Sequence, residues 1–174
     1  MKTKELVIMA LFAAIGAVLH SIMPPVLFGM KPDMMLVMMF MGILLFPRVQ
    51  NVLMIGIVTG IISALTTSFP GGQLPNIIEK PVTAFLFLAL ALALLIKKSV
   101  KTAAAAVITI AGTFISGVIF LALALLIVGL PGGFTALVLA VVLPAAALNA
   151  IAIVIMYPIV QTILRRSNMI ETVK

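Results

Sequence analysis

The fold is decided by a short apolar run that follows a proline-rich break, KPDMMLVMMFMGILLF at residues 31–46. From Met34 to Phe46 the run has 13 residues, about 20 Å of α-helix, whereas the hydrocarbon core of a bilayer is about 30 Å thick. A helix of this length cannot cross a membrane by itself. The preceding segment, 21–33, is interrupted by prolines and a glycine and cannot form a regular helix. We therefore expect it to fold back into the outer half of the protein as a re-entrant loop.

The rest of the chain is equally apolar. Hydrophobic residues make up 64% of the 174 residues and charged residues 9%, and the mean hydropathy is +1.41. Soluble domains have an apolar share of roughly half. The composition therefore predicts a single all-α integral membrane domain over residues 1–174. Windows of about 20 apolar residues give a bundle of six transmembrane helices, at 6–23, 34–46, 51–68, 81–96, 102–130 and 134–164.

The basic residues set the expected orientation. Alternate connections contain nine of the eleven lysines and arginines, and the other set contains only Lys31 and Lys80. Because short cytoplasmic loops are enriched in Lys and Arg, we expect both termini to be cytoplasmic in a multi-pass protein. The loops around Lys31, Gln73–Lys80 and Pro131–Gly133 would then face outside.

Several functions are excluded by what the sequence lacks. The net charge is +7, but the basic residues lie in short clusters between apolar runs, so a nucleic-acid interface is not expected. With no cysteine and one histidine, neither a thiolate nor a histidine metal site is expected. No nucleotide-binding loop or nucleophile motif occurs either. We expect no cofactor and no enzymatic activity.

The four charged residues of the outer side form two mixed pairs, Lys31 with Asp33 and Glu79 with Lys80. Each pair is associated with a Lys-Pro step, Lys31-Pro32 in the first and Lys80-Pro81 in the second. Because Pro is favoured in the first turn of a helix, the fourth helix is expected to begin at Pro81. Two helix N-termini with their partial positive charge would then face the outer half of the bundle.

This arrangement fits an amino-acid zwitterion. Lys31 or Lys80 would pair with the carboxylate, and Glu79 or Asp33 with the ammonium group. The alternative is that Asp33 and Glu79 only complement helix dipoles while the lysines extend to the membrane interface.

Other candidates have two interpretations each. Met34, at the outer end of the methionine-rich second helix, is expected to border the substrate, whereas most of the other methionines are expected to pack against lipid. Asn76 would bond the substrate or only close the turn around Pro70-Gly71-Gly72. Asn149 would join an interhelical network or reach the substrate. His20 would be an interface residue or a proton relay.

Small residues recur at helical spacing on the first and third helices, among them Ala10 and Ala14. Such stripes let helix backbones approach closely. They indicate packing within the bundle or docking of a separate membrane subunit.

In its six short spans and in three local features, the chain resembles the bacterial tryptophan-transport family TrpP. The local features are the stripe Ala10-Leu11-Phe12-Ala13-Ala14, the proline-rich excursion before Lys31-Pro32-Asp33, and the sequence Asn76-Ile77-Ile78-Glu79-Lys80-Pro81. That family is similar in fold to the S-components of energy-coupling-factor transporters.

The resemblance implies a protein of the bacterial cell membrane that binds L-tryptophan on its extracellular side and mediates its uptake. It also implies that Ala10 and Ala14 dock onto the coupling subunit of an energy-coupling-factor module with its ATPases. The alternatives are an S-component for another small solute such as a vitamin, or a membrane assembly protein that transports nothing. Uptake without such a module would need a solute or proton gradient.

Overall fold

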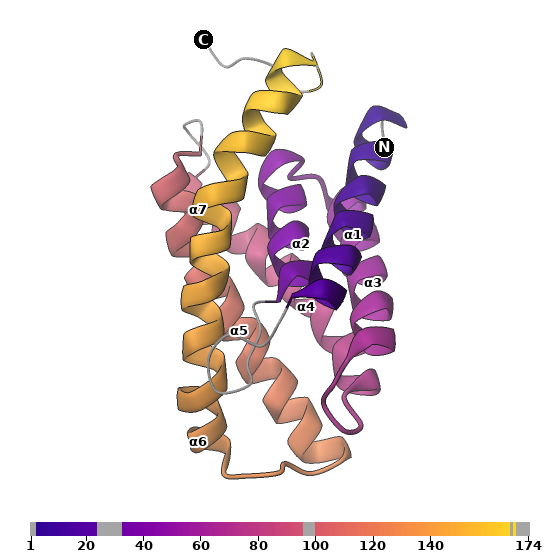
Figure 1. Cartoon of the computed structure of the whole chain (residues 1–174), viewed down its shortest axis with the longest axis vertical. Helices are drawn as coiled ribbons and strands as arrows, with labels where there is room; N and C mark the ends of the chain where they lie inside the picture. The colour runs from indigo at the N-terminus through magenta and orange to yellow at the C-terminus, as the bar shows by residue number, and fades with distance from the viewer. Residues whose placement is uncertain (1–2, 24–32, 96–99, 168, 170–174) are drawn as a thin grey trace.

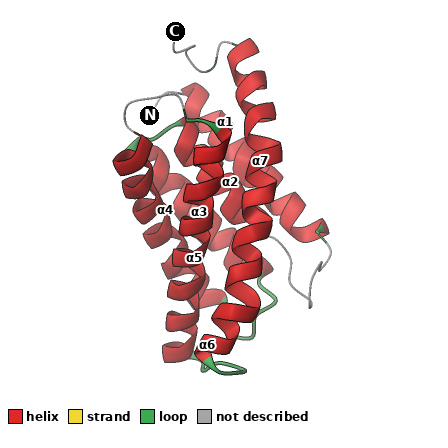
Figure 2. Ribbon diagram, turned by 90° about the vertical axis from the view of Figure 1, so that its left-hand side faces the viewer, coloured by secondary structure: helices red, strands yellow, loops and turns green. Residues whose placement is uncertain are grey.

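The computed structural model describes residues 3–23, 33–95, 100–167 and 169, and these residues form a bundle of helices with no strand (Figures 1 and 2). Within these ranges, five helical stretches are long and apolar enough to cross a membrane, and a shorter apolar helix accompanies them. This agrees with the predicted helical membrane bundle. The elements are α1 (Thr3–Ile22), α2 (Met34–Leu45), α3 (Val49–Thr66), α4 (Gln73–Leu95), α5 (Thr102–Ile127), α6 (Phe134–Leu137), η1 (Val138–Val142) and α7 (Leu143–Arg166).

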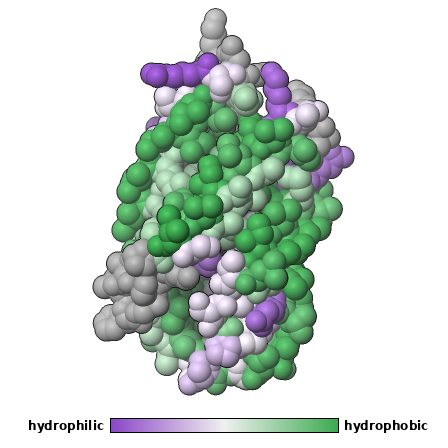
Figure 3. Space-filling model, turned by 45° about the vertical axis from the view of Figure 1, so that its right-hand side comes forward, coloured by the Kyte–Doolittle hydropathy of each residue, from purple (hydrophilic) through white to green (hydrophobic). Residues whose placement is uncertain are grey.

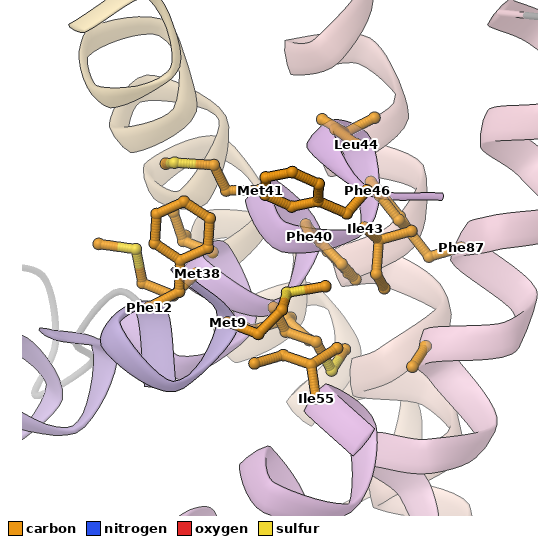
Figure 4. Packing of buried hydrophobic residues seen from close by; sticks show 14 of the residues in the cluster. Met9, Phe12, Met38, Phe40, Met41, Ile43, Leu44, Phe46, Ile55 and Phe87 are labelled. Atoms are coloured by element: carbon orange, nitrogen blue, oxygen red, sulfur yellow. The ribbon is translucent and has the colours of Figure 1, made fainter. Parts of the chain in front are cut away.

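The short helix α2 is enclosed by the other helices. Every residue from Met34 to Leu44 is buried. A helix that is apolar on all sides is expected in a protein core, and α2 forms the centre of this one. Figure 4 shows its side chains packed among Met9 and Phe12 of α1, Ile55 of α3 and Phe87 of α4. The expectation that most of the methionines in this helix face lipid is therefore wrong, because they form the core.

A glycine on α5 makes room for an aromatic pair in this core. Phe40 of α2 and Phe87 of α4 stack with their ring centroids 3.8 Å apart. A Cβ atom at Gly112 would lie 2.6 Å from the Phe87 ring and 2.8 Å from the Phe40 ring. The absence of a side chain at this position lets α5 approach the stacked rings.

Helix α4 begins at Gln73, not at Pro81, so the expected start of the fourth helix is wrong. Pro81 lies inside the helix, where it lacks the N–H that would donate to the carbonyl of Ile77. Gly60 of α3 packs against this point. A Cβ atom there would be 3.2 Å from the Asn76 carbonyl oxygen and 3.3 Å from that of Ile77. Glu79 and Lys80 therefore lie within a helix, and the dipole argument made for Lys80 does not hold.

The final span contains a wide turn. In η1, the N–H of Leu143 donates to the carbonyl of Val138, five residues earlier. Pro144 follows directly and has no N–H for a regular helical bond. Because a π-turn inserts one extra residue, it changes which face of α7 points inward, and Asn149 faces the core.

Both ends of the described chain lie at the same end of the bundle, since α1 begins and α7 ends at the top of Figure 1. The described basic residues other than Lys80 belong to the helix ends and turns at this end: Lys4, Arg48, Lys101, Arg165 and Arg166. Figure 3 shows purple, hydrophilic atoms at the top, above a broad apolar face, with pale and purple atoms again in the lower half.

A polar contact that the sequence did not reveal ties α1 to the start of α3 at this end. Glu5 pairs with Arg48 at 3.0 Å and accepts a hydrogen bond from the Asn51 amide at 2.9 Å. Asn51 also donates to the Phe46 carbonyl at 3.4 Å. These contacts hold the last turn of the central helix at the end of the bundle where α1 begins.

Candidate functional site

Asp33 lies at the start of the central helix and contacts three other elements of the chain. Its Oδ1 accepts the N–H of Leu36 at 3.0 Å, which caps α2. Its Oδ2 accepts from Lys80 Nζ of α4 at 2.9 Å, and His20 Nδ1 of α1 lies 3.7 Å from Oδ1. The side chain of Asp33 is 27% exposed, whereas that of Lys80 is 5% exposed. Asp33 is therefore the more accessible member of the pair.

Glu79 is fully buried beside the same ammonium group. Its Oε2 lies 3.2 Å from Lys80 Nζ. Its Oε1 accepts the hydroxyl of Thr83 at 2.7 Å and the hydroxyl of Ser116 from α5. A buried carboxylate is stable only when it is paired and hydrogen-bonded, and these three groups fulfil that requirement. We call Asp33, Lys80 and Glu79 the ion cluster.

Asn149 connects the ion cluster to the last two long helices. Its Oδ1 accepts the backbone N–H of Asp33 at 3.0 Å, and its Nδ2 donates to Thr113 Oγ1 of α5 at 3.3 Å. The residue is completely buried. Of the two interpretations of Asn149, the geometry favours the interhelical network, which fixes the position of the Asp33 backbone.

The remaining predicted site residues occupy different positions. Met34 is buried directly after Asp33. Asn76 donates to the Gly72 carbonyl at 2.8 Å, a bond within the start of α4 that favours the turn-closing interpretation. Lys31, and with it the predicted Lys31–Asp33 pair and most of the re-entrant loop, lies outside the described residues.

Three hydroxyl residues of the site were missed by the sequence analysis: Thr83, Thr113 and Ser116. Thr83 follows Glu79 by four residues, and Thr109, Thr113 and Ser116 recur at spacings of four and three along an otherwise apolar helix. These spacings place side chains on one helix face. The residues could have been predicted from such a polar stripe on a transmembrane helix.

The ion cluster has one more carboxylate than ammonium groups, so its formal charge is −1 when His20 is neutral. Ionisable groups inside membrane bundles are rare and usually functional. Such a cluster can bind a further cationic group at Asp33. Lys80 can also bind an anionic group, provided that this group replaces Asp33 or Glu79 as a partner of the ammonium group.

Ala10 and Ala14 lie elsewhere, on the outer face of α1. Both are exposed and border an open apolar groove of about 270 Å³ between α1 and α3. The groove is lined by Met9, Ala10, Ala13, Ala14, Met54, Ile55, Val58 and Ile62. No charged side chain takes part in this lining.

Comparison with known proteins gives the family. The model of the family described as tryptophan transporter TrpP matches residues 2–165. This chain belongs to the TrpP family. It is 75% identical to a probable tryptophan transport protein of Bacillus subtilis over the full length of both chains. It is 47% identical to one of Clostridium acetobutylicum, over 95% of this chain and 96% of that protein.

A third relative of the same name, from Clostridium perfringens, is 40% identical over 97% of both chains. No solved structure matches the chain, so the expected likeness to S-components stays a prediction. TrpP membership together with the apolar helices identifies a multi-pass membrane protein of a transporter family, and not an enzyme.

Proposed function

We propose that this protein takes up L-tryptophan and binds it as a zwitterion at the ion cluster. The observation that carries the proposal is the buried Lys80, which shares its ammonium group between fully buried Glu79 and partly exposed Asp33. The names of three full-length relatives supply the substrate.

Binding would exchange one internal ion pair for two pairs with the substrate. The substrate carboxylate takes the place of Asp33 on Lys80, and Asp33 receives the substrate ammonium group. Glu79 is enclosed and already accepts two hydroxyls, so its role is to hold Lys80 charged and in position. Lys31 remains a second candidate for the carboxylate.

The proposed entry side is extracellular. The described basic residues other than Lys80 gather at the end where α1 begins, which the positive-inside rule assigns to the cytoplasm of the bacterial cell. Asp33 belongs to the opposite end of α2. Tryptophan would therefore reach the ion cluster from outside.

A titration of the purified protein with L-tryptophan, tryptamine and indole-3-propionate tests this function. Tryptamine lacks the carboxylate and indole-3-propionate lacks the ammonium group. Since a hydrogen bond to a charged group is worth about 1.5–3 kcal/mol, we expect each analogue to bind at least about tenfold more weakly. Tryptamine with the affinity of tryptophan would exclude Lys80 as the carboxylate partner. A vitamin carrier or a pure assembly protein predicts no saturable tryptophan binding.

For energy, we propose docking of a coupling subunit of an energy-coupling-factor module along the groove beside Ala10 and Ala14. The exposed small side chains and apolar lining support this partner. Replacement of both alanines by leucine should leave tryptophan binding unchanged and abolish uptake. Uptake that persists in a host without such modules, and that collapses with a protonophore, would instead favour a solitary carrier.

A further inference from the structure

Two aromatic rings pack on one another without belonging to the closed core. Phe69, in the connection between α3 and α4, meets Phe120 of α5 edge to face, with ring centroids 5.3 Å apart and planes at 87°. Both residues are half-buried. By contrast, Phe40 and Phe87 are completely buried and stacked on one another. Only the first pair has aromatic surface that is still uncovered.

The position of Phe120 along α5 relates it to the ion cluster. It follows Ser116 by four residues, so the two side chains share a helix face about one turn, or 5.4 Å, apart. Ser116 donates to Glu79. Since α5 begins at the end of the bundle where α1 begins, Phe120 lies one turn further from that end than this contact.

The turn after α3 is built to hold Phe69 against α5. The Phe69 N–H donates to Thr67 Oγ1 at 3.2 Å, and the Gly72 N–H donates to the Phe69 carbonyl at 3.0 Å. Gly71 has φ +70°, and a Cβ atom there would lie 2.5 Å from Val128 at the end of α5. The turn can therefore close onto α5 only with glycine at this position.

From this geometry we propose that Phe69 and Phe120 form the wall that receives the indole ring and selects an aromatic amino acid. This inference rests on the proposed function, since the ion cluster must hold the zwitterion for its side chain to extend outward along α5. An edge-to-face pair leaves a ring face on which a third aromatic ring can pack. A substrate with an aliphatic side chain would not make this ring contact. The pair is therefore a specificity determinant and not a general apolar surface.

The protein has no tryptophan of its own, so excitation of indole reports only the ligand. We expect Phe120→Leu and Phe69→Leu each to raise the Kd for L-tryptophan about five- to tenfold. They should also move the emission of the bound ligand toward that of free tryptophan. Phe114→Leu is the matched control, because Phe114 is another phenylalanine of the same helix and is 40% exposed. Its Kd should stay within twofold of the wild-type value.

Each outcome has one meaning. If wild-type protein binds no tryptophan, the proposed function fails and the aromatic wall fails with it. If wild-type protein binds tryptophan and both variants have the wild-type Kd, the aromatic wall is excluded and the proposed function stands. This holds even if the variants melt at lower temperatures. If Phe120→Leu does not fold, Phe69→Leu decides, because it lies in a turn outside the helices.

Discussion

Replacement of Lys80 by methionine is expected to lower the free energy of unfolding by about 3–5 kcal/mol. The change removes the ammonium group and leaves Glu79 as a fully buried carboxylate without an ionic partner. It also removes the hydrogen bond from Lys80 to Asp33, which joins the start of α2 to α4. Equilibrium unfolding in mixed micelles, compared with wild-type protein, measures the effect.

The control is a second substitution in the same cluster. Glu79→Gln added to Lys80→Met removes the stranded charge, and the amide can still accept from Thr83 and Ser116. We expect the double variant to recover most of the lost stability. A Lys80→Met protein as stable as wild type would contradict the presence of a buried, charge-balanced cluster.

Asn149→Leu is expected to have the second largest effect, because it removes the acceptor of the Asp33 backbone N–H together with the link to Thr113. A partly buried N–H left without a partner costs about 1–3 kcal/mol. We also expect tryptophan affinity to fall at least about tenfold, since Asp33 is no longer held in position. Thermal unfolding and ligand titration of the same sample measure the two effects.

Asn51→Leu provides a matched comparison at the opposite end of the bundle. Asn51 is also completely buried, and it bonds Glu5 and the Phe46 carbonyl. This variant should lose stability yet bind tryptophan with the wild-type affinity. Equal losses of affinity in both variants would show that general destabilisation, and not the position of Asp33, governs binding.

Hydropathy and charge were sufficient to predict the helical spans and the unusual shortness of α2. They also singled out Asp33, Glu79 and Lys80, which the structure brings together. They could not distinguish core from lipid-facing positions, because both are apolar in a membrane protein. For this reason the methionines of α2 were assigned to the wrong environment. A sequence of apolar runs also cannot show that five longer helices enclose the shorter one.

Local signals failed where tertiary packing overrode them. Pro81 has the appearance of a helix start, but α4 continues through it, and Gly56 and Gly60 of α3 let the two helix backbones pack closely along this stretch. The π-turn before Pro144 shifts the inward face of α7, so the partners of Asn149 could not be derived from a regular helical period. Ser116 and Thr113 could have been found from their spacing, but their partners lie on other helices.

The most direct measurement is a tryptophan titration of Lys80→Met/Glu79→Gln, set beside the single variant Glu79→Gln. Both proteins lack the buried carboxylate of residue 79, and they differ only in the presence of the ammonium group. We predict that Glu79→Gln binds L-tryptophan and that the folded double variant shows no saturable binding. A folded double variant that binds tryptophan as tightly as Glu79→Gln would contradict recognition of the zwitterion by Lys80.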